Sequence, residues 1–175
     1  MSPREYVTGK VLASLVPLLA VTTLPLAFLY VGNVFFSDHP LGYVQDHLRE
    51  IVGIPLGGLL IALVYTLLGL AVASLTSRRA FATVGFVLLL IVSGLIGGVL
   101  RNALALGPNS RLANLQFQPV WLAQKIVGEA PAAVVSDGPL QRFDTPDTAL
   151  LIVSNAVIVL ACVGVLALRY RRSGR

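Results

Sequence analysis

The sequence predicts an all-α membrane protein, a polytopic bundle of four transmembrane helices that forms a single domain over residues 1–175. Of its 175 residues, 56% are hydrophobic and only 12% are charged, whereas soluble domains usually carry about 25% charged residues. Four stretches lack Asp, Glu, Lys and Arg, and each is long enough for the roughly 20 helical residues that cross a hydrocarbon core. These predicted spans are residues 11–36, 51–77, 80–100 and 148–168.

Charged residues are divided unevenly between the two sides of this bundle. An even number of spans places both termini on one side, which holds eight basic residues and one acidic residue, Glu5. The other side holds five basic and seven acidic residues. The positive-inside rule therefore predicts a multi-pass protein of the cell membrane with both termini in the cytoplasm. Orientation also explains the net charge of +5, so we expect no binding of nucleic acid.

The first span is too long for a cleavable signal peptide, whose apolar region has roughly 7–15 residues. Pro17 and Pro25 in this span and Pro55 in the next remove backbone donors, which neighbouring groups must compensate. Such helices are usually packed in a bundle. No span carries an ionisable side chain apart from Tyr and Cys, which argues against a proton-driven pump acting alone.

Two glycine pairs stand four residues apart, Gly53 with Gly57 and Gly94 with Gly98. This spacing allows another helix to approach closely, although glycines scattered by chance explain it equally well. Cys162 is the single cysteine. It cannot form an internal disulfide, and we expect a small residue that packs between helices.

The first external connection, residues 37–50, contains two His and three carboxylates. They could bind zinc in principle, but a fixed ligand spacing such as HExxH is missing. We therefore expect a polar turn followed by an interfacial helix, and we assign no metal site.

The second external connection, residues 101–147, is long and too apolar for disorder. Within it, Pro119 opens a run that ends at Gly128, as is typical of a short helix. Leu122 and Ile126 share one face of this helix, so we expect it at the external interface with Trp121 as an anchor. A re-entrant hairpin is the alternative geometry.

The first ten residues have the pattern of a helix start. Ser2 is a good N-cap, Pro3 suits the first helical position, and Glu5 lies three residues after Ser2 as in a capping box. A short cytoplasmic helix is therefore expected, which displays Arg4, Glu5 and Tyr6 and leads through Lys10 into the first span. A helix that only anchors the span at the interface is the alternative.

Three features resemble the ABC-2-type transporter permeases, the membrane-spanning subunits of ABC exporters. The segment SPREYVTGKVLA, residues 2–13, resembles their cytoplasmic coupling segment and the helix that follows it. The segment LGLAVASLTSRRA, residues 68–80, is similar to the tight basic turn between their fourth and fifth spans. The order of the remaining parts is also similar: a span, a long external segment with a QPVWL turn, a last span and a basic tail.

The resemblance covers nearly the whole chain through loose motifs, and it departs from the family in one respect. Members typically have six spans, whereas the four predicted here match the last four. An internal start at Met1, a split gene and a fragment are three explanations that the sequence leaves open.

The resemblance implies a subunit that performs no covalent chemistry and pairs with a second permease copy, as a homodimer or heterodimer. ATP would be bound by a separate ATP-binding cassette subunit, since the P-loop pattern G-x-x-x-x-G-K-[ST] does not occur in the chain. No cofactor is expected in the chain itself. The residues implied to couple to the cassette subunit are Arg4, Glu5, Tyr6, Lys10, Arg78 and Arg79, the last two being more typical of a positive-inside anchor.

An intramembrane enzyme and an accessory membrane protein are the two alternative classes of function. An intramembrane serine protease would need a His facing Ser93, but His39 and His47 both lie in the external connection. A small structural or accessory membrane protein without a transport role is the main alternative. Uncharged spans suit a lipid-like, amphipathic or hydrophobic cargo, and the 11 Arg against 2 Lys hint at a GC-rich bacterial gene.

Overall fold

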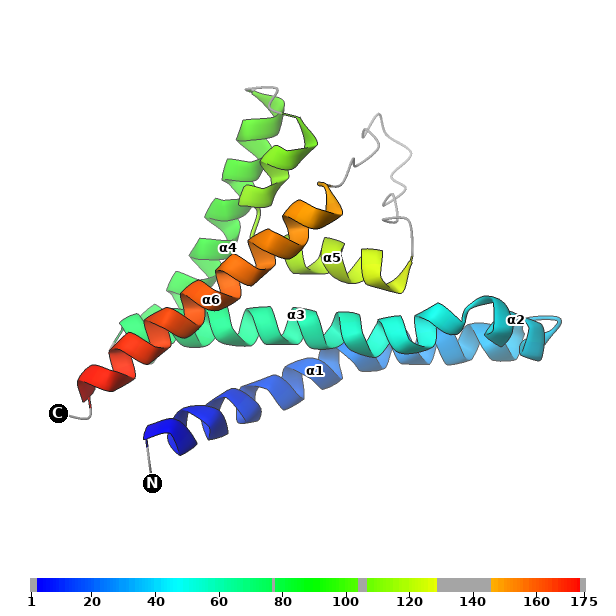
Figure 1. Ribbon diagram of the computed structural model, residues 1–175, viewed down its shortest axis with the longest axis horizontal. Helices are drawn as coiled ribbons and strands as arrows, with labels where there is room; N and C mark the ends of the chain where they lie inside the picture. Colours follow the sequence, from blue (N-terminus) through cyan, green and yellow to red (C-terminus); the bar gives the residue numbers. More distant parts are fainter. Residues whose placement is uncertain (1–2, 77, 104–106, 129–145, 174–175) are drawn as a thin grey trace.

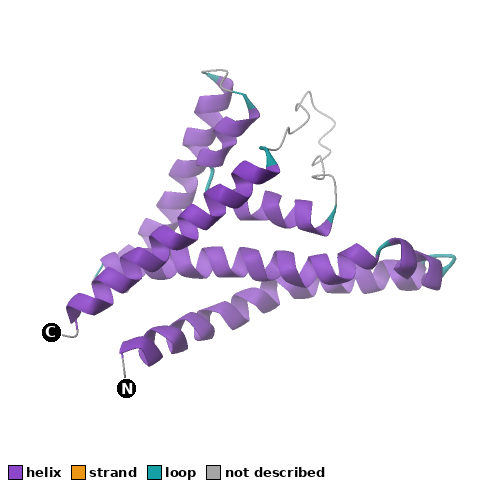
Figure 2. Cartoon of the chain, viewed as in Figure 1, coloured by secondary structure: helices purple, strands orange, loops and turns teal. Residues whose placement is uncertain are grey.

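The computed structural model describes residues 3–76, 78–103, 107–128 and 146–173, and these residues form helices joined by short turns (Figures 1 and 2). Ser2, Ser77 and residues 129–145 of the second connection lie outside the described residues. The elements in chain order are α1 (Pro3–Phe36), α2 (Pro40–Asp46), α3 (Leu48–Leu75), α4 (Arg79–Asn102), the 3-10 helix η1 (Pro108–Ala113), α5 (Gln118–Val127) and α6 (Thr148–Ser173).

All four predicted spans are confirmed as helices long and apolar enough to cross a membrane. Their apolar parts are Thr8–Phe36, Leu48–Leu75, Ala80–Leu100 and Thr148–Arg169. The second helix ends slightly earlier than predicted, because Thr76 has an extended backbone with φ −117° and ψ 145°. Large hydrophobic side chains remain exposed along α1, α4 and α6, as expected for helices whose surroundings are lipid.

The N-terminal segment is continuous with the first span. We predicted a short separate helix over the first ten residues, but α1 runs without a break from Pro3 to Phe36. Gly9 does not interrupt it, because a single glycine costs a helix only about 1 kcal/mol. Pro17 and Pro25 also lie inside the helix.

Helix α3 lies at the centre of the fold and contacts α1, α4, α5 and α6. Figure 1 shows α1 alongside α3, whereas α4 and α6 lie against one end of α3 and diverge from it toward their other ends. Both termini lie at the end where these helices meet, which we call the terminal end; the opposite ends of the four long helices are called the loop end. Helix α5 occupies the wedge between α3 and α6.

A compact apolar cluster joins α3 to α6 near the terminal end. Its buried members are Leu67, Leu68, Ala71, Cys162 and Leu166. Cys162 is only 5% exposed, which confirms the prediction that it packs between helices. Small and medium side chains allow the two helices to lie close together here.

Candidate functional site

The segment between α4 and α6 folds back among the long helices. Its first part, η1, contacts α4 and α6, and its second part, α5, contacts α3 and α6. Helix α5 begins at Gln118 with Pro119 in its first turn and ends before Gly128, whose φ of 96° is left-handed. The predicted proline start and glycine stop are therefore confirmed, because glycine adopts this conformation without a steric cost.

Glycines of α3 provide the surface on which α5 packs. A Cβ added at Gly53 would lie 2.7 Å from the Cα of Val127, and one added at Gly57 would lie 3.1 Å from the Cβ of Ala123. The prediction of close approach at this pair is confirmed. The helix that approaches Gly53 and Gly57 is the short helix α5. The neighbouring Gly58 faces Thr23 of α1.

The second predicted glycine pair is correct only in part. Gly94 and Gly97 face Asn114, with the Asn114 Cβ 3.1 Å from a Cβ added at Gly97, whereas a Cβ added at Gly98 would meet nothing within 4 Å. The contacting surface is the turn after η1 rather than a straight helix. Glycines four residues apart form a flat surface for a straight helix, but a turn contacts other positions. The four-residue spacing therefore does not predict which glycines of α4 are in contact here.

Polar side chains hold the non-helical turn between η1 and α5. The Ser93 hydroxyl accepts a hydrogen bond from the Leu115 N–H at 3.2 Å, and the Tyr65 hydroxyl donates to the Gln116 carbonyl. Gln118, fully buried, donates through Nε2 to Ser154 Oγ at 2.8 Å and to the Leu112 carbonyl. We call this set the polar junction: Tyr65, Ser93, Asn114, Gln116, Gln118 and Ser154.

Some buried polar atoms have no hydrogen-bond partner among the described residues. Gln118 Oε1 belongs to the polar junction, and Thr66 Oγ1 and Asn155 Oδ1 are on residues that follow Tyr65 and Ser154 in the chain. A buried acceptor without a partner costs free energy, so such atoms are satisfied by water or a ligand in most proteins. The polar junction can therefore receive a hydrogen-bond donor.

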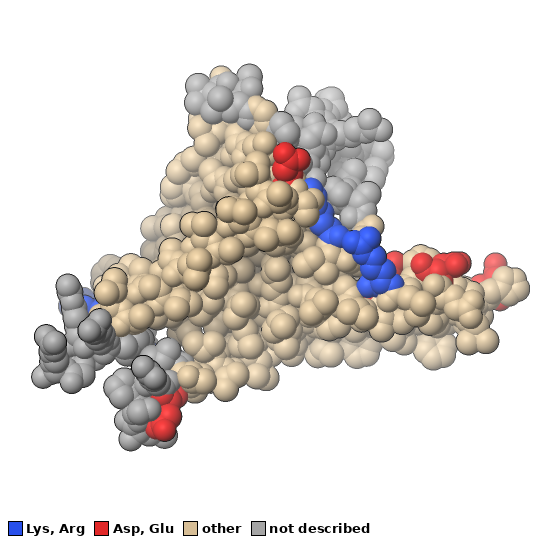
Figure 3. Space-filling view, viewed as in Figure 1, with Lys and Arg blue, Asp and Glu red and all other residues tan. Residues whose placement is uncertain are grey.

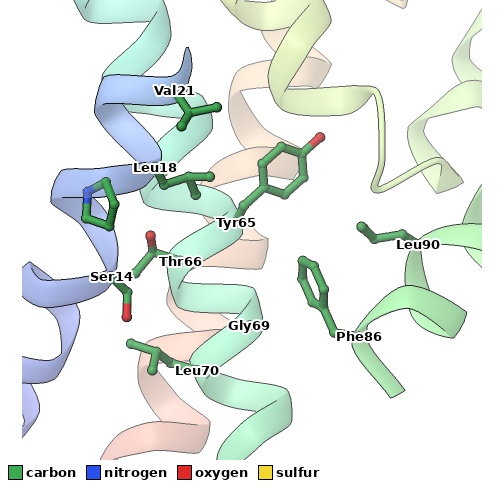
Figure 4. Close-up of a pocket in the computed structure, with 10 residues that line it drawn as sticks. Ser14, Leu18, Val21, Tyr65, Thr66, Gly69, Leu70, Phe86 and Leu90 are labelled. Atoms are coloured by element: carbon green, nitrogen blue, oxygen red, sulfur yellow. The ribbon is translucent and has the colours of Figure 1, made fainter. Parts of the chain in front are cut away.

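An apolar cavity lies beside the polar junction, between α1, α3 and α4. Its volume is about 530 Å³, and Figure 4 shows the side chains that line it. Tyr65 links the cavity to the polar junction, because its ring lines the cavity while its hydroxyl binds the Gln116 carbonyl. Opposite Tyr65, the wall from α1 includes Leu18 and Val21. The cavity can accept a hydrophobic group next to polar atoms.

The residues expected to couple to a partner lie at the terminal end. Glu5 and Lys10 are exposed on the first turns of α1, and Arg78 is exposed at the start of α4. Arg4, Tyr6 and Arg79 lie on the same helices, but their side chains are outside the described part. The start of α1 and the turn between α3 and α4 share this end of the molecule (Figure 1).

Trp121, expected as an external anchor, is half-buried against other side chains. Its ring stacks on Phe117 with centroids 5.9 Å apart, and the Arg111 guanidinium lies 5.9 Å from the centroid of its ring. These contacts fix the ring on the surface of α5.

The polar turn between α1 and α3 also forms ordered contacts. His47 stacks on Tyr43 at 4.1 Å between ring centroids, and its Nε2 lies 3.8 Å from the Glu50 carboxylate. Within the described ranges, no three His, Cys, Asp or Glu side chains come together as a metal site would require.

No protein-family model, no curated protein and no solved structure matches the chain. Its function is therefore argued from its own residues. Most of the polar junction was not predicted from the sequence. Ser93 was predicted only to lack the partner of a nucleophile, and no role was predicted for Tyr65, Gln118 or Ser154, although isolated polar residues in an apolar sequence are a usable signal.

Proposed function

We propose that the chain is the membrane-spanning permease subunit of an ATP-driven ABC exporter of the cell membrane, with both termini in the cytoplasm. Two such subunits would enclose the translocation path within the lipid bilayer. A separate ATP-binding cassette subunit would bind ATP and drive the change in shape. The chain itself would carry no ATPase site and would not bind nucleic acid.

The observation that carries this proposal is the non-helical turn over residues 114–117. Ser93, which binds this turn, lies seven residues from the end of the apolar part of α4 at Leu100, or roughly 10 Å along the helix. If Ala80–Leu100 spans a hydrocarbon core of about 30 Å, the turn is re-entrant and lies about a third of the way across it. Non-helical backbone is tolerated there only when it is buried in protein or lines a polar cavity.

Broken helices near the middle of the membrane are typical of the substrate sites of transporters. The apolar cavity beside the polar junction favours a hydrophobic or amphipathic cargo over an ion. These features support a transport role.

The energy source is argued from residue chemistry. Residues 11–36, 51–77, 80–100 and 148–168 contain no carboxylate or amine that could form a proton relay, and the chain has no P-loop. A partner must therefore supply the energy. Residues 2–13 and 68–80 resemble ABC-2-type permeases, so we propose the cassette subunit as this partner. Arg4, Glu5 and Tyr6 are the residues proposed to contact it.

Reversing the charges of two predicted contacts tests this proposal. The double variant Arg4→Glu, Glu5→Arg should insert and express normally, because both residues precede the apolar span. Partner binding should fall strongly, since like charges at an interface can cost several kcal/mol. Replacing the pair with alanines should have a milder effect.

The measurement is co-purification of the cassette subunit, together with transport-linked ATP hydrolysis in reconstituted membranes. The matched control reverses Arg171 and Arg172 in the basic tail to Glu. Normal partner binding and normal coupled hydrolysis in the Arg4 and Glu5 variant would reduce this segment to a membrane anchor.

A further inference from the structure

A groove of about 590 Å³ opens on the side of the bundle between α3, α5 and α6. Arg49, Lys125 and Thr148 form its rim at the loop end, where α3 and α6 begin. Below the rim the walls are almost entirely apolar, with Leu63 and Ile152 exposed toward the surroundings. The lower lining consists of Leu60, Leu63, Val64, Leu122, Ile126, Ile152, Asn155, Ala156 and Val159.

The length of the groove matches one leaflet of a membrane. On α6 it extends from Thr148 to Val159, eleven residues or roughly 17 Å along the helix axis. Half of a typical hydrocarbon core is about 15 Å. A transmembrane helix of a partner would need a groove about as long as the whole hydrocarbon core, which is twice the length observed. A lipid acyl chain reaches only to the middle of the bilayer, so the groove is long enough for it.

Basic groups lie where the headgroup of such a lipid would be. Figure 3 shows Lys and Arg side chains as a short continuous stripe on this face of the molecule, with Asp or Glu side chains near both of its ends. Lys125 Nζ donates to the Pro146 carbonyl at 2.7 Å and to Thr148 Oγ1 at 3.1 Å. Arg49 donates through Nε and Nη2 to the carbonyls of Ile126 and Lys125, at 3.2 and 3.1 Å.

All of these acceptors are neutral, so they do not offset the two positive charges. Asp147 and Glu50 are neighbours in the chain, but within the described residues neither carboxylate forms an ion pair with Arg49 or Lys125. Donors also remain available. The Arg49 guanidinium has five N–H groups and uses two of them, so three remain. The Lys125 ammonium has three N–H groups and uses two, so one remains.

We propose that this groove binds an anionic phospholipid, with one acyl chain along α3 and α6 and its phosphate against Arg49 and Lys125. Two positive charges at the mouth of an apolar groove attract an anionic headgroup, and hydrogen bonds from charged donors to phosphate are strong. The site does not rest on the proposed transport function, because its test measures contact with lipid and not transport.

The test uses tryptophan fluorescence in the full chain. Trp121→Phe removes the single tryptophan, and Ile152→Trp places a reporter in the groove, where Ile152 is 53% exposed. The protein is reconstituted into vesicles of phosphatidylcholine and phosphatidylglycerol, and either lipid in turn carries brominated chains that quench the reporter on contact. Phosphatidylglycerol should occupy the groove with a preference of about tenfold.

Two charge variants and a second reporter complete the design. Arg49→Gln with Lys125→Gln should reduce the preference to near one, and Lys125→Gln alone should lower it if the double variant does not fold. Arg49→Lys with Lys125→Arg should keep it, because the charges remain. A reporter at Leu95→Trp, on the exposed surface of α4, should show no preference in any background.

Three results would overturn the proposal. Equal quenching by both lipids in the charged protein would remove the headgroup selectivity. A preference that survives the double glutamine variant would place its origin elsewhere. Quenching by neither lipid would mean that protein, such as a second copy of the chain, covers the groove.

Discussion

The terminal end and the loop end of the bundle are held together by different kinds of contact. At the terminal end, α3 and α6 meet through apolar side chains, including Leu68, Cys162 and Leu166. Toward the loop end, α5 packs against Gly53 and Gly57, and hydrogen bonds from Gln118 and from Tyr65, farther along α3, hold the turn before it. The first arrangement can be expected of any helical membrane protein, whereas the second holds a bent segment in one position.

The difference has a physical origin in the lipid solvent. Lipid tails are as apolar as leucine, so apolar packing between helices gains only close contact and no hydrophobic free energy. A polar group at the same depth must find a partner inside the protein. Polar residues therefore determine where the chain bends, while apolar residues determine how closely the helices approach.

The largest effect is expected from a cavity at the terminal end. Leu68→Ala should lower the free energy of unfolding by about 3 kcal/mol, because the removed side chain leaves a void in a packed cluster. The measurement is reversible unfolding in mixed detergent micelles, together with the reactivity of Cys162 toward a thiol reagent, which should increase. Leu160→Ala, at a position 70% exposed, is the matched control. A comparable loss in the control would show that this cluster is not a distinct core.

A smaller loss of stability is expected when a side chain is added to the glycine surface of α3 on which α5 packs. Gly53→Val should cost about 2 kcal/mol, because the new side chain would collide with the backbone at Val127. Hydrogen exchange should accelerate in α5, while the reactivity of Cys162 stays unchanged. Gly98→Val, where an added Cβ meets nothing within 4 Å, should be nearly neutral. If exchange in α5 is the same in both variants, α5 does not depend on this contact.

The smallest effect is expected in the polar junction. Gln118→Leu should cost about 1 kcal/mol, since hydrogen bonds between transmembrane helices are worth about 0.6 to 1.7 kcal/mol. Gln45→Leu on α2, an exposed position, is the control. Because Gln118 belongs to the loop end, its effect should add to that of Leu68→Ala. A double variant that departs from additivity by more than about 0.5 kcal/mol would show that the two ends are coupled.

Specific residues show how far the sequence could be interpreted. Pro119 and Gly128 predicted the start and end of α5, because both act through local backbone geometry. Gly53 and Gly57 predicted a close contact but not its partner. Gly98 was wrongly included, since nothing in the sequence states that the contacting surface is a turn. Ser154 and Gln118 are 36 residues apart in the chain, so no local pattern could pair them.

A membrane protein with four long apolar helices could be predicted from the chain alone, because the length and composition of a span are local properties set by the bilayer. The helical form of α5 could be predicted in the same way. The three-dimensional arrangement was needed to show that α5 packs on α3, that Ser93 and Tyr65 bind the turn before it, and that Arg49 and Lys125 meet above an apolar groove. Those pairings depend on how the helices are arranged in three dimensions, and residues distant in the chain have no local signal that specifies them.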